Sequence, residues 1–253
     1  MQKIRYRGTM IYQARAGQVA YGYAIGMLCA EWHIPFIPGD LNNAGTFPFP
    51  VRYESVKGVS GAEVLRGNGE SYAQIMAAAA KKLEAEGVRA ITGNCGFMAA
   101  FQEYVASQVN IPVFLTSLVQ IPMLLNMLGS QHHIAILTAN SASLTDGLLA
   151  SAGITDSSRL TIQGMETYSH FNDVILKELG TLDEDKMRME AVQAAKDAIK
   201  RDPAIRAFML ECSDLPPYSK AIEEATGLPV FDWANFINYV YNATVPRSYS
   251  GIV

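Results

Sequence analysis

RAITGNC at residues 89–95 and RAFMLEC at residues 206–212 are two copies of one pattern. The same offset of 117 residues relates a second pair of segments, IPVF at 111–114 and LPVF at 228–231. A repeat at one fixed spacing indicates two structural units of like topology. Each unit reads as strand, cysteine, helix and a short second strand, so the sequence predicts two similar β-α-β halves.

Short apolar runs alternate with helix-like segments along the rest of the chain. The runs at 88–93, 133–139 and 205–211 are too short for buried helices and suit strands that are covered on both faces. Alternation of this kind is typical of an α/β fold with mostly parallel sheets. In such sheets ligands bind beyond the carboxyl ends of the strands, which is where the repeat places its two cysteines.

Composition and charge exclude several classes of protein. Of 253 residues 49% are hydrophobic and only 17% are charged, which predicts a core-rich globular chain. Twenty basic and 24 acidic side chains give a net charge of −4, so we expect no nucleic-acid partner. The stretch 104–145 has no charged residue, but prolines and a histidine pair interrupt it, so we expect no membrane span. Three cysteines without a CxxC spacing predict neither a disulfide framework nor a zinc site, and favour a reducing cytoplasm.

The two cysteines of the repeat, Cys95 and Cys212, are predicted to lie where a strand passes into a helix. Unpaired N–H groups and the positive end of a helix dipole lower the pKa of a thiol and bind a carboxylate. Most cysteines are buried and inert, but two in register with a repeat favour a functional role. Cys29 has no such context, and we expect it to be structural.

Three motifs together carry a resemblance to a known family: TGNCGFM at 92–98, LECSDLPPY at 210–218 and GDLNNAGTFPFPV at 39–51. They resemble the aspartate/glutamate racemase superfamily, in a less characterised branch. The resemblance implies two flavodoxin-like parallel-sheet lobes related by pseudo-twofold symmetry, with the active site in the cleft between them. We expect the first lobe to comprise residues 1–115 plus 232–253, and the second to comprise 116–231.

The chemistry of the superfamily suits a pair of thiols. Inverting a stereogenic carbon by proton transfer needs a base on one face and an acid on the other. Cys95 and Cys212 are the expected pair, exchanging roles with the direction of reaction, and their sulfurs should face each other across one cleft. N–H donors of Gly96 and Ser213 would stabilise the charge that develops on the substrate carboxylate. No cofactor is expected, because neither a pyridoxal-phosphate lysine nor a metal is needed.

Further residues are predicted to contribute to the site, and each of them could instead have a structural role. Ser213 either reaches the substrate or caps its helix, and Asp214 either assists Cys212 or caps a helix. Turn formation is an alternative role for the residues of the loop after the first strand. The candidates for substrate binding are Asn94, Gly96, Ser213, Thr138, Asn140, Ser141, Asp40 and Asn43. No residue is predicted to bind a metal.

The sequence thus predicts a cofactor-independent racemase or epimerase acting on an acidic amino acid or a related small carboxylate. Alternatives are other reactions of the superfamily: hydantoin racemisation, arylmalonate-type decarboxylation or maleate-type isomerisation. A non-catalytic module that binds small molecules is the alternative from a different class. The apolar region 111–128 would suit a homodimer interface or the core.

Overall fold

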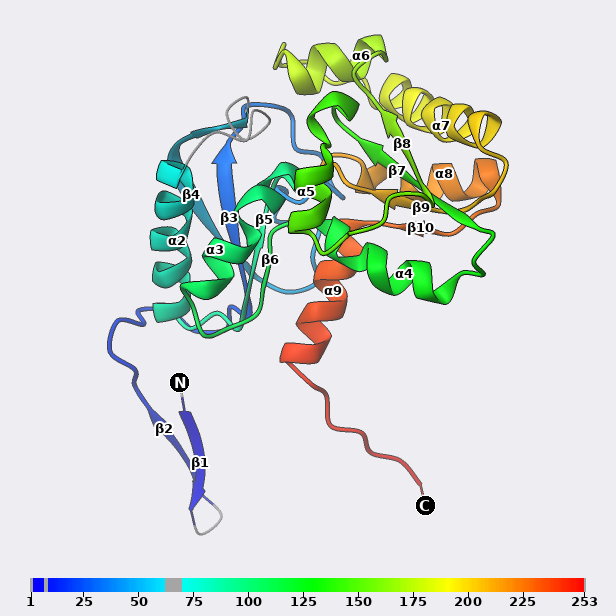
Figure 1. Ribbon diagram of the computed structural model, residues 1–253. Coiled ribbons are helices and arrows are strands. Elements are labelled where there is room, and N and C mark those ends of the chain that lie inside the picture. Colours follow the sequence, from blue (N-terminus) through cyan, green and yellow to red (C-terminus); the bar gives the residue numbers. More distant parts are fainter. Residues whose placement is uncertain (1, 7–8, 62–69, 253) are drawn as a thin grey trace.

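Two α/β lobes lie side by side in the computed structural model, which describes residues 2–6, 9–61 and 70–252 (Figure 1). Each lobe contains a four-stranded sheet whose paired strands all run parallel. The first sheet consists of β3 (Ile25–Glu31), β4 (Val51–Ser60), β5 (Ala90–Gly93) and β6 (Val113–Phe114). The second consists of β7 (His133–Thr138), β8 (Leu160–Gly164), β9 (Ile205–Leu210) and β10 (Val230–Phe231).

The two sheets have the same topology. Their strand orders are β4-β3-β5-β6 and β8-β7-β9-β10, so each lobe places its strands in the sequence second, first, third, fourth. The repeat segments RAITGNC and RAFMLEC supply β5 and β9, which occupy equivalent positions next to the short strands β6 and β10. The predicted two-lobed α/β fold is confirmed.

Helices surround both sheets. In the first lobe α2 (Glu70–Ala85) ends before Gly87, whose φ of 91° is the left-handed conformation that stops a helix. The α-helices that follow are α3 (Gln102–Ser107), α4 (Ile121–Met127), α5 (Asp146–Ser151), α6 (Ser169–Phe171), α7 (Glu184–Arg201), α8 (Ser219–Thr226) and α9 (Trp233–Thr244). Short 3₁₀ helices are η1 (Gly96–Phe101), η2 (Ser117–Gln120), η3 (Ser141–Ser143) and η5 (Pro216–Tyr218), and η4 (Asn172–Leu176) is a π-helix.

Central strands are continuous apolar runs because helices cover both faces of each sheet. Residues 134–138 of β7 and 207–210 of β9 are fully buried. The apolar runs of the sequence therefore correspond to the middle of each sheet, and the residues just beyond them lie where the two lobes meet.

The C-terminal helix α9 returns to the first lobe after the second lobe is complete. Trp233 and Ile237 pack in one buried cluster with Ile25 and Met27 of β3. The Trp233 indole N–H also donates to Thr92 Oγ1 over 3.1 Å. The chain therefore passes between the lobes twice, first after β6 and again between β10 and α9.

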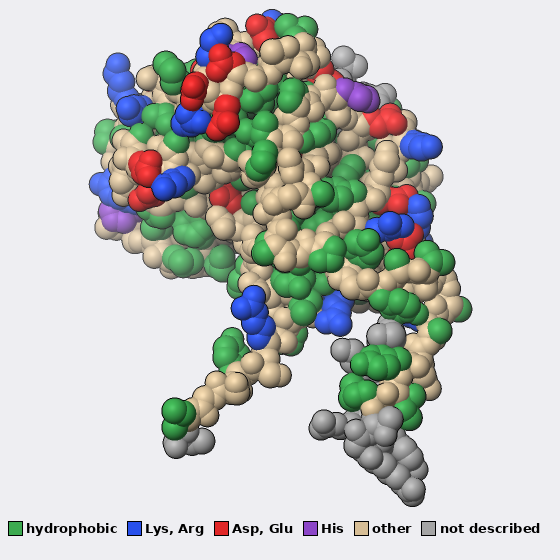
Figure 2. All heavy atoms as spheres, turned by 180° about the vertical axis from the view of Figure 1, so that it is seen from behind, with side chains coloured by type: hydrophobic (Ala, Val, Ile, Leu, Met, Phe, Trp, Pro, Cys, Tyr) green, Lys and Arg blue, Asp and Glu red, His purple; other side chains and the backbone are tan. Residues whose placement is uncertain are grey.

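An antiparallel hairpin precedes the first lobe, formed by β1 (Gln2–Tyr6) and β2 (Thr9–Gln13), and it projects away from both sheets in Figure 1. The face seen in Figure 2 carries acidic and basic side chains interspersed with apolar ones. Among the described residues, no helix combines the length and the apolar character that crossing a membrane requires.

Candidate active site

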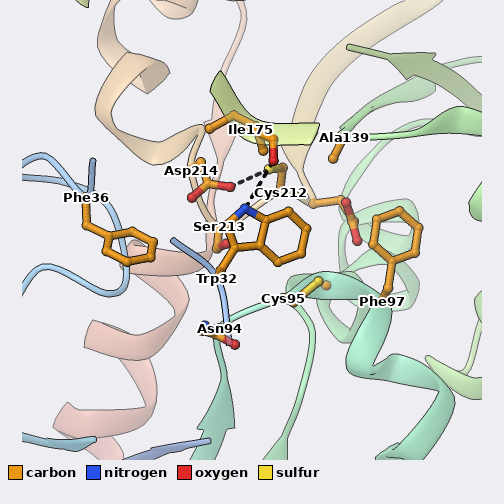
Figure 3. A pocket seen from close by; sticks show the side chains of 12 residues that line it. Trp32, Phe36, Asn94, Cys95, Phe97, Ala139, Ile175, Cys212, Ser213 and Asp214 are labelled. Carbon is orange, nitrogen blue, oxygen red and sulfur yellow. Dashed lines mark hydrogen bonds between the residues drawn. The ribbon is translucent and has the colours of Figure 1, made fainter. Parts of the chain in front are cut away.

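A cavity of about 380 Å³ lies beyond the carboxyl ends of β5 and β9, and both repeat cysteines line it. Cys95 and Cys212 each follow their strand by two residues and reach the cavity from different lobes (Figure 3). The cavity is lined by Trp32, Phe36, Asn94, Cys95, Gly96, Phe97, Ala139, Ile175, Glu211, Cys212, Ser213 and Asp214. The constant spacing of the repeat thus brings the two thiols to one site.

The thiols are not activated in the way that a helix start would predict. Burial raises the pKa of the Cys95 thiol well above its ordinary value, and the nearby Glu211 raises it further, although a bond from the Phe97 N–H opposes the shift. Burial likewise raises the pKa of Cys212, with Asp214 and Glu211 adding to it. Burial of both thiols, together with the nearby carboxyl groups of Glu211 and Asp214, accounts for the difference.

Asp214 contacts Cys212 and does not cap a helix. The Cys212 thiol donates to Asp214 Oδ2 over 3.3 Å, whereas the N-cap of η5 is Leu215 and has no side-chain cap. Burial raises the pKa of Asp214, and hydrogen bonds from Asp40 and Cys212 lower it. Burial and the charge of Asp214 raise the pKa of Asp40 well above its usual range. Asp40 therefore supports Asp214 through a hydrogen bond, and Asp214 accepts a hydrogen bond from the Cys212 thiol.

Glu211, directly before Cys212, is a fully buried site residue that the sequence analysis missed. Its Oε2 accepts a hydrogen bond of 2.8 Å from Thr138 Oγ1, and its Oε1 has no partner. Burial raises the pKa of Glu211 to about 7. A Cβ atom on Gly96 would lie 2.0 Å from Oε1, so Gly96 is required here to make room for the carboxyl group.

Aromatic side chains form much of the remaining wall: Trp32 and Phe36 follow β3, and Phe97 follows Cys95. The Trp32 indole N–H donates to the Ile175 carbonyl over 3.1 Å, which joins the first lobe to η4 of the second (Figure 3). Beside it, the His33 N–H donates to Glu178 Oε2 over 2.8 Å.

The cavity lining is acidic. Within the part of the chain that the structure describes, the lining includes the carboxyl groups of Glu211 and Asp214 but no Lys, Arg or His. Low-dielectric burial strengthens the field of those carboxyl groups. The cavity is therefore suited to a ligand with a cationic group.

Several residues predicted to bind substrate are held by other parts of the protein. Asn94 lines the cavity, but its amide is bonded to both backbone groups of Ala30, extending the pairing of β3 with β5. Thr138 and Ser141, which were expected to bind substrate, bind carboxyl groups of the protein itself. Thr138 bonds to Glu211, and Ser141 donates its hydroxyl and its N–H to Glu166.

The other predicted residues divide between turns and the cavity. Asn140 caps η3 by accepting from the Ser143 N–H, and lies outside the lining. Asn43 shapes its loop through the Phe36 carbonyl and the Gly45 N–H, and so positions a wall residue of the cavity. Ser213 and Gly96 line the cavity directly.

Cys29 lies in β3, outside the cavity lining, where burial raises its pKa to about 12.

In the described ranges no three His, Cys, Asp or Glu side chains are placed so that they could hold a metal ion.

Dimethylsulfoniopropionate lyases are among the proteins that are similar in sequence to this chain. The chain is 33% identical to a dimethylsulfoniopropionate lyase of Durusdinium sp. clade D, over 83% of this chain and 71% of that protein. It is 34% identical to dimethylsulfoniopropionate lyase 7 of Emiliania huxleyi (strain CCMP1516), over 83% of this chain but only 63% of the relative's length. No family model matches the chain.

Solved structures share the fold at much lower identity. A putative Asp/Glu racemase from Yersinia pestis has a TM-score of 0.58 and 14% identity, covering 87% of this chain and 99% of that one. An arylmalonate decarboxylase has a TM-score of 0.56 and 17% identity, covering 88% and 94%. The chain belongs to the family of these dimethylsulfoniopropionate lyases. Its fold is shared with racemases and decarboxylases of the aspartate/glutamate racemase superfamily. The named relatives are enzymes, and cleavage of dimethylsulfoniopropionate is not among the reactions expected from the sequence.

Proposed function

We propose that this protein is a lyase that cleaves dimethylsulfoniopropionate to dimethyl sulfide and acrylate. The observation that carries the proposal is the cavity lining, which in the described residues has two carboxyl groups and three aromatic rings but no cationic side chain. The substrate named for the relatives carries a fixed positive charge on sulfur at one end and a carboxylate at the other. A sulfonium cation is attracted both to carboxylates and to the faces of aromatic rings.

The same lining disfavours an acidic amino acid as substrate. Aspartate and glutamate carry a second carboxylate, whose burial near the Asp214 carboxyl group would cost free energy without a positive partner. This weighs against the side-chain specificity expected from the sequence. It leaves the α-proton chemistry of the superfamily in place.

The proposed reaction begins with the step that a racemase also uses. Cys212, whose proton passes to Asp214, removes a proton from the carbon next to the substrate carboxylate. The electron pair of that C–H bond forms the C=C bond of acrylate. The C–S bond at the next carbon breaks, and its electrons leave with sulfur as neutral dimethyl sulfide. Cys212 is then a thiol again, and the proton held by Asp214 passes to solvent, which restores the starting state.

The substrate itself would help to activate the thiol. Burial and two carboxyl groups keep Cys212 protonated in the free protein. A positive charge bound in the same cavity favours the thiolate, because opposite charges at short range lower a thiol pKa. Ionisation is thereby coupled to the arrival of a cationic ligand.

The second candidate function is racemisation, which the presence of two thiols on one cavity favours. Elimination needs one base, whereas inversion of a stereocentre needs both Cys95 and Cys212. The two functions therefore differ in how each cysteine should respond to replacement.

The test is an assay of the purified chain with dimethylsulfoniopropionate, measuring dimethyl sulfide in the headspace and acrylate in solution. Parallel samples with amino acids in deuterated water measure exchange of the α-hydrogen. For a lyase, Cys212→Ala should abolish release, Cys95→Ala should retain part of it, and Cys29→Ala should match the unmodified chain. Exchange and inversion of an amino acid, lost in both Cys95→Ala and Cys212→Ala, with no dimethyl sulfide formed, would replace the lyase proposal by the racemase.

A further inference from the structure

Glu211 presents a hydrogen-bonding atom that the protein does not use. The residue follows β9 directly, is fully buried and lines the cavity. Its Oε2 accepts from Thr138 Oγ1 over 2.8 Å, and the backbone N–H of Ala139 also interacts with the carboxyl group. Its Oε1 has no hydrogen-bond partner and is buried. Leaving a buried polar atom unpaired costs free energy, so its retention beside a cavity points to a ligand.

The bonding of Oε2 indicates where a proton on this carboxyl group lies. Oε2 already accepts a hydrogen bond from Thr138 whereas Oε1 has no partner, so the proton of the neutral acid is placed on Oε1. Burial raises the pKa of Glu211 to about 7, so the neutral acid is well populated near neutral pH. The protonated Oε1 is then a donor that needs an acceptor.

No acceptor for this donor is supplied by the groups around it. Oε1 lies over Gly96, whose ideal Cβ position is 2.0 Å away. The titratable groups that face Glu211 are Cys95 from the first lobe and, on its own loop, Cys212 and Asp214, with Asp40 behind Asp214. Thr138 and Ala139 at the end of β7 are uncharged, and neither is a hydrogen-bond partner of Oε1.

We propose that Glu211 is the residue that binds the substrate carboxylate, donating a hydrogen bond from Oε1 in a cavity whose described lining has no Lys or Arg. A carboxylate is the strongest acceptor that a small substrate offers to such a donor. The bond would strengthen as removal of the α-proton moves charge onto the carboxylate oxygens, so it would favour the transition state. The inference rests on the proposed function only in requiring a substrate with a carboxylate, and it holds for the lyase and the racemase alike.

The test uses propionate as the probe, because it is a simple carboxylate that cannot react. Its binding is measured by calorimetry between about pH 6 and pH 9. In the unmodified chain the affinity should fall by about tenfold per pH unit above the pKa of Glu211, since only the protonated form donates. Glu211→Gln keeps an N–H donor at every pH, provided that its carbonyl takes the bonds from Thr138 and Ala139. Its affinity for propionate should therefore stay nearly constant.

A matched control is Asp232→Asn. Asp232 is also a buried carboxyl group whose pKa is raised by burial, but it caps α9 and lies outside the cavity lining. Asparagine can also cap a helix, so this variant should fold and retain the pH dependence of the unmodified chain.

The outcomes separate this inference from the proposed function. A pH dependence that persists in Glu211→Gln, or a failure of the unmodified chain to bind propionate at any pH, would overturn the role of Glu211. Binding that responds as expected in a chain that releases no dimethyl sulfide would support Glu211 and reject the lyase. Release of dimethyl sulfide with pH-independent binding of propionate would reject Glu211 and leave the lyase standing.

Discussion

Replacing Gly96 with alanine would test the close contact on which the geometry of the cavity depends. The new Cβ would lie 2.0 Å from Glu211 Oε1 and 2.7 Å from the Glu211 carbonyl oxygen. Overpacking of this kind costs about 1–3 kcal/mol. Displacing the carboxyl group also breaks its bond from Thr138, at about 1.5–3 kcal/mol for a bond to a charged group. We expect Gly96→Ala to lower the free energy of unfolding by about 2.5–6 kcal/mol at a pH above 7, where Glu211 is ionised.

The assay is urea or thermal unfolding of four proteins: the unmodified chain, Gly96→Ala, Glu211→Ala and the double variant. For a chain of this size each kcal/mol lowers Tm by roughly 2–4 °C, so the loss in Gly96→Ala should be plain. The double variant should be more stable than the sum of the single effects predicts, because the side-chain overlap is absent from it. Part of the cost should remain, since the carbonyl oxygen of Glu211 is still close.

Gly147→Ala is the control for the substitution itself. Gly147 lies in α5, and the nearest atom to its ideal Cβ is Thr145 Oγ1 at 3.8 Å, an ordinary contact. Alanine should stabilise this helix by up to about 1 kcal/mol. If Gly96→Ala stays within about 1 kcal/mol of the unmodified chain, or the effects of the double variant simply add, the packing of Glu211 on Gly96 is not as described.

Three other predictions concern charge and aromatic contact in the cavity. Asp214→Asn removes the charge that accepts the Cys212 proton, so the rate of dimethyl sulfide release should fall at least about 100-fold. Trp32→Leu removes an aromatic face and should raise KM for the sulfonium substrate about 2- to 30-fold, whereas Trp32→Phe, which keeps a ring, should raise it less. Because the folded-state pKa of Glu211 is raised from 4.5 to about 7, its contribution to stability is present below about pH 4.5 and is lost as pH rises through 7. In urea titrations the unmodified chain should therefore lose about 3 kcal/mol more than Glu211→Gln between about pH 4.5 and pH 8, and equal losses would contradict the raised pKa.

The topology of the two lobes could be predicted from the sequence because it is encoded locally and twice. Apolar runs of strand length identify β5, β7 and β9, and the fixed offset assigns β5 and β9 to equivalent places. The position of Cys95 and Cys212 on one cavity follows from that assignment. No knowledge of side-chain packing is needed for this step.

The chemistry around the thiols depends on packing between segments far apart in the chain, which a single sequence does not display. Glu211 was overlooked because its carboxyl group is turned toward Gly96 and Thr138, and neither is its sequence neighbour. For the same reason the expected lowering of the thiol pKa values is wrong in direction, since it took account of helix starts but not of burial. The place of Trp32 at the site could have been predicted, because Trp32 directly follows a strand whose carboxyl end faces the cleft.

Two segments connect the lobes, one within residues 115–132 and one at 231–233. Together they form a hinge. They leave rotation about the line that joins them as the easiest relative motion of the halves. Any rotation that separates the lobes must break two hydrogen bonds beside the cavity, Trp32 to Ile175 and His33 to Glu178. Each such bond contributes about 0.5–1.5 kcal/mol, so the two bonds alone favour the closed form by roughly 5- to 150-fold, and the apolar contacts shared by the two lobes add to this. The rate at which small molecules enter and leave the cavity would then depend on the breaking of these two hydrogen bonds as well as on the chemical step.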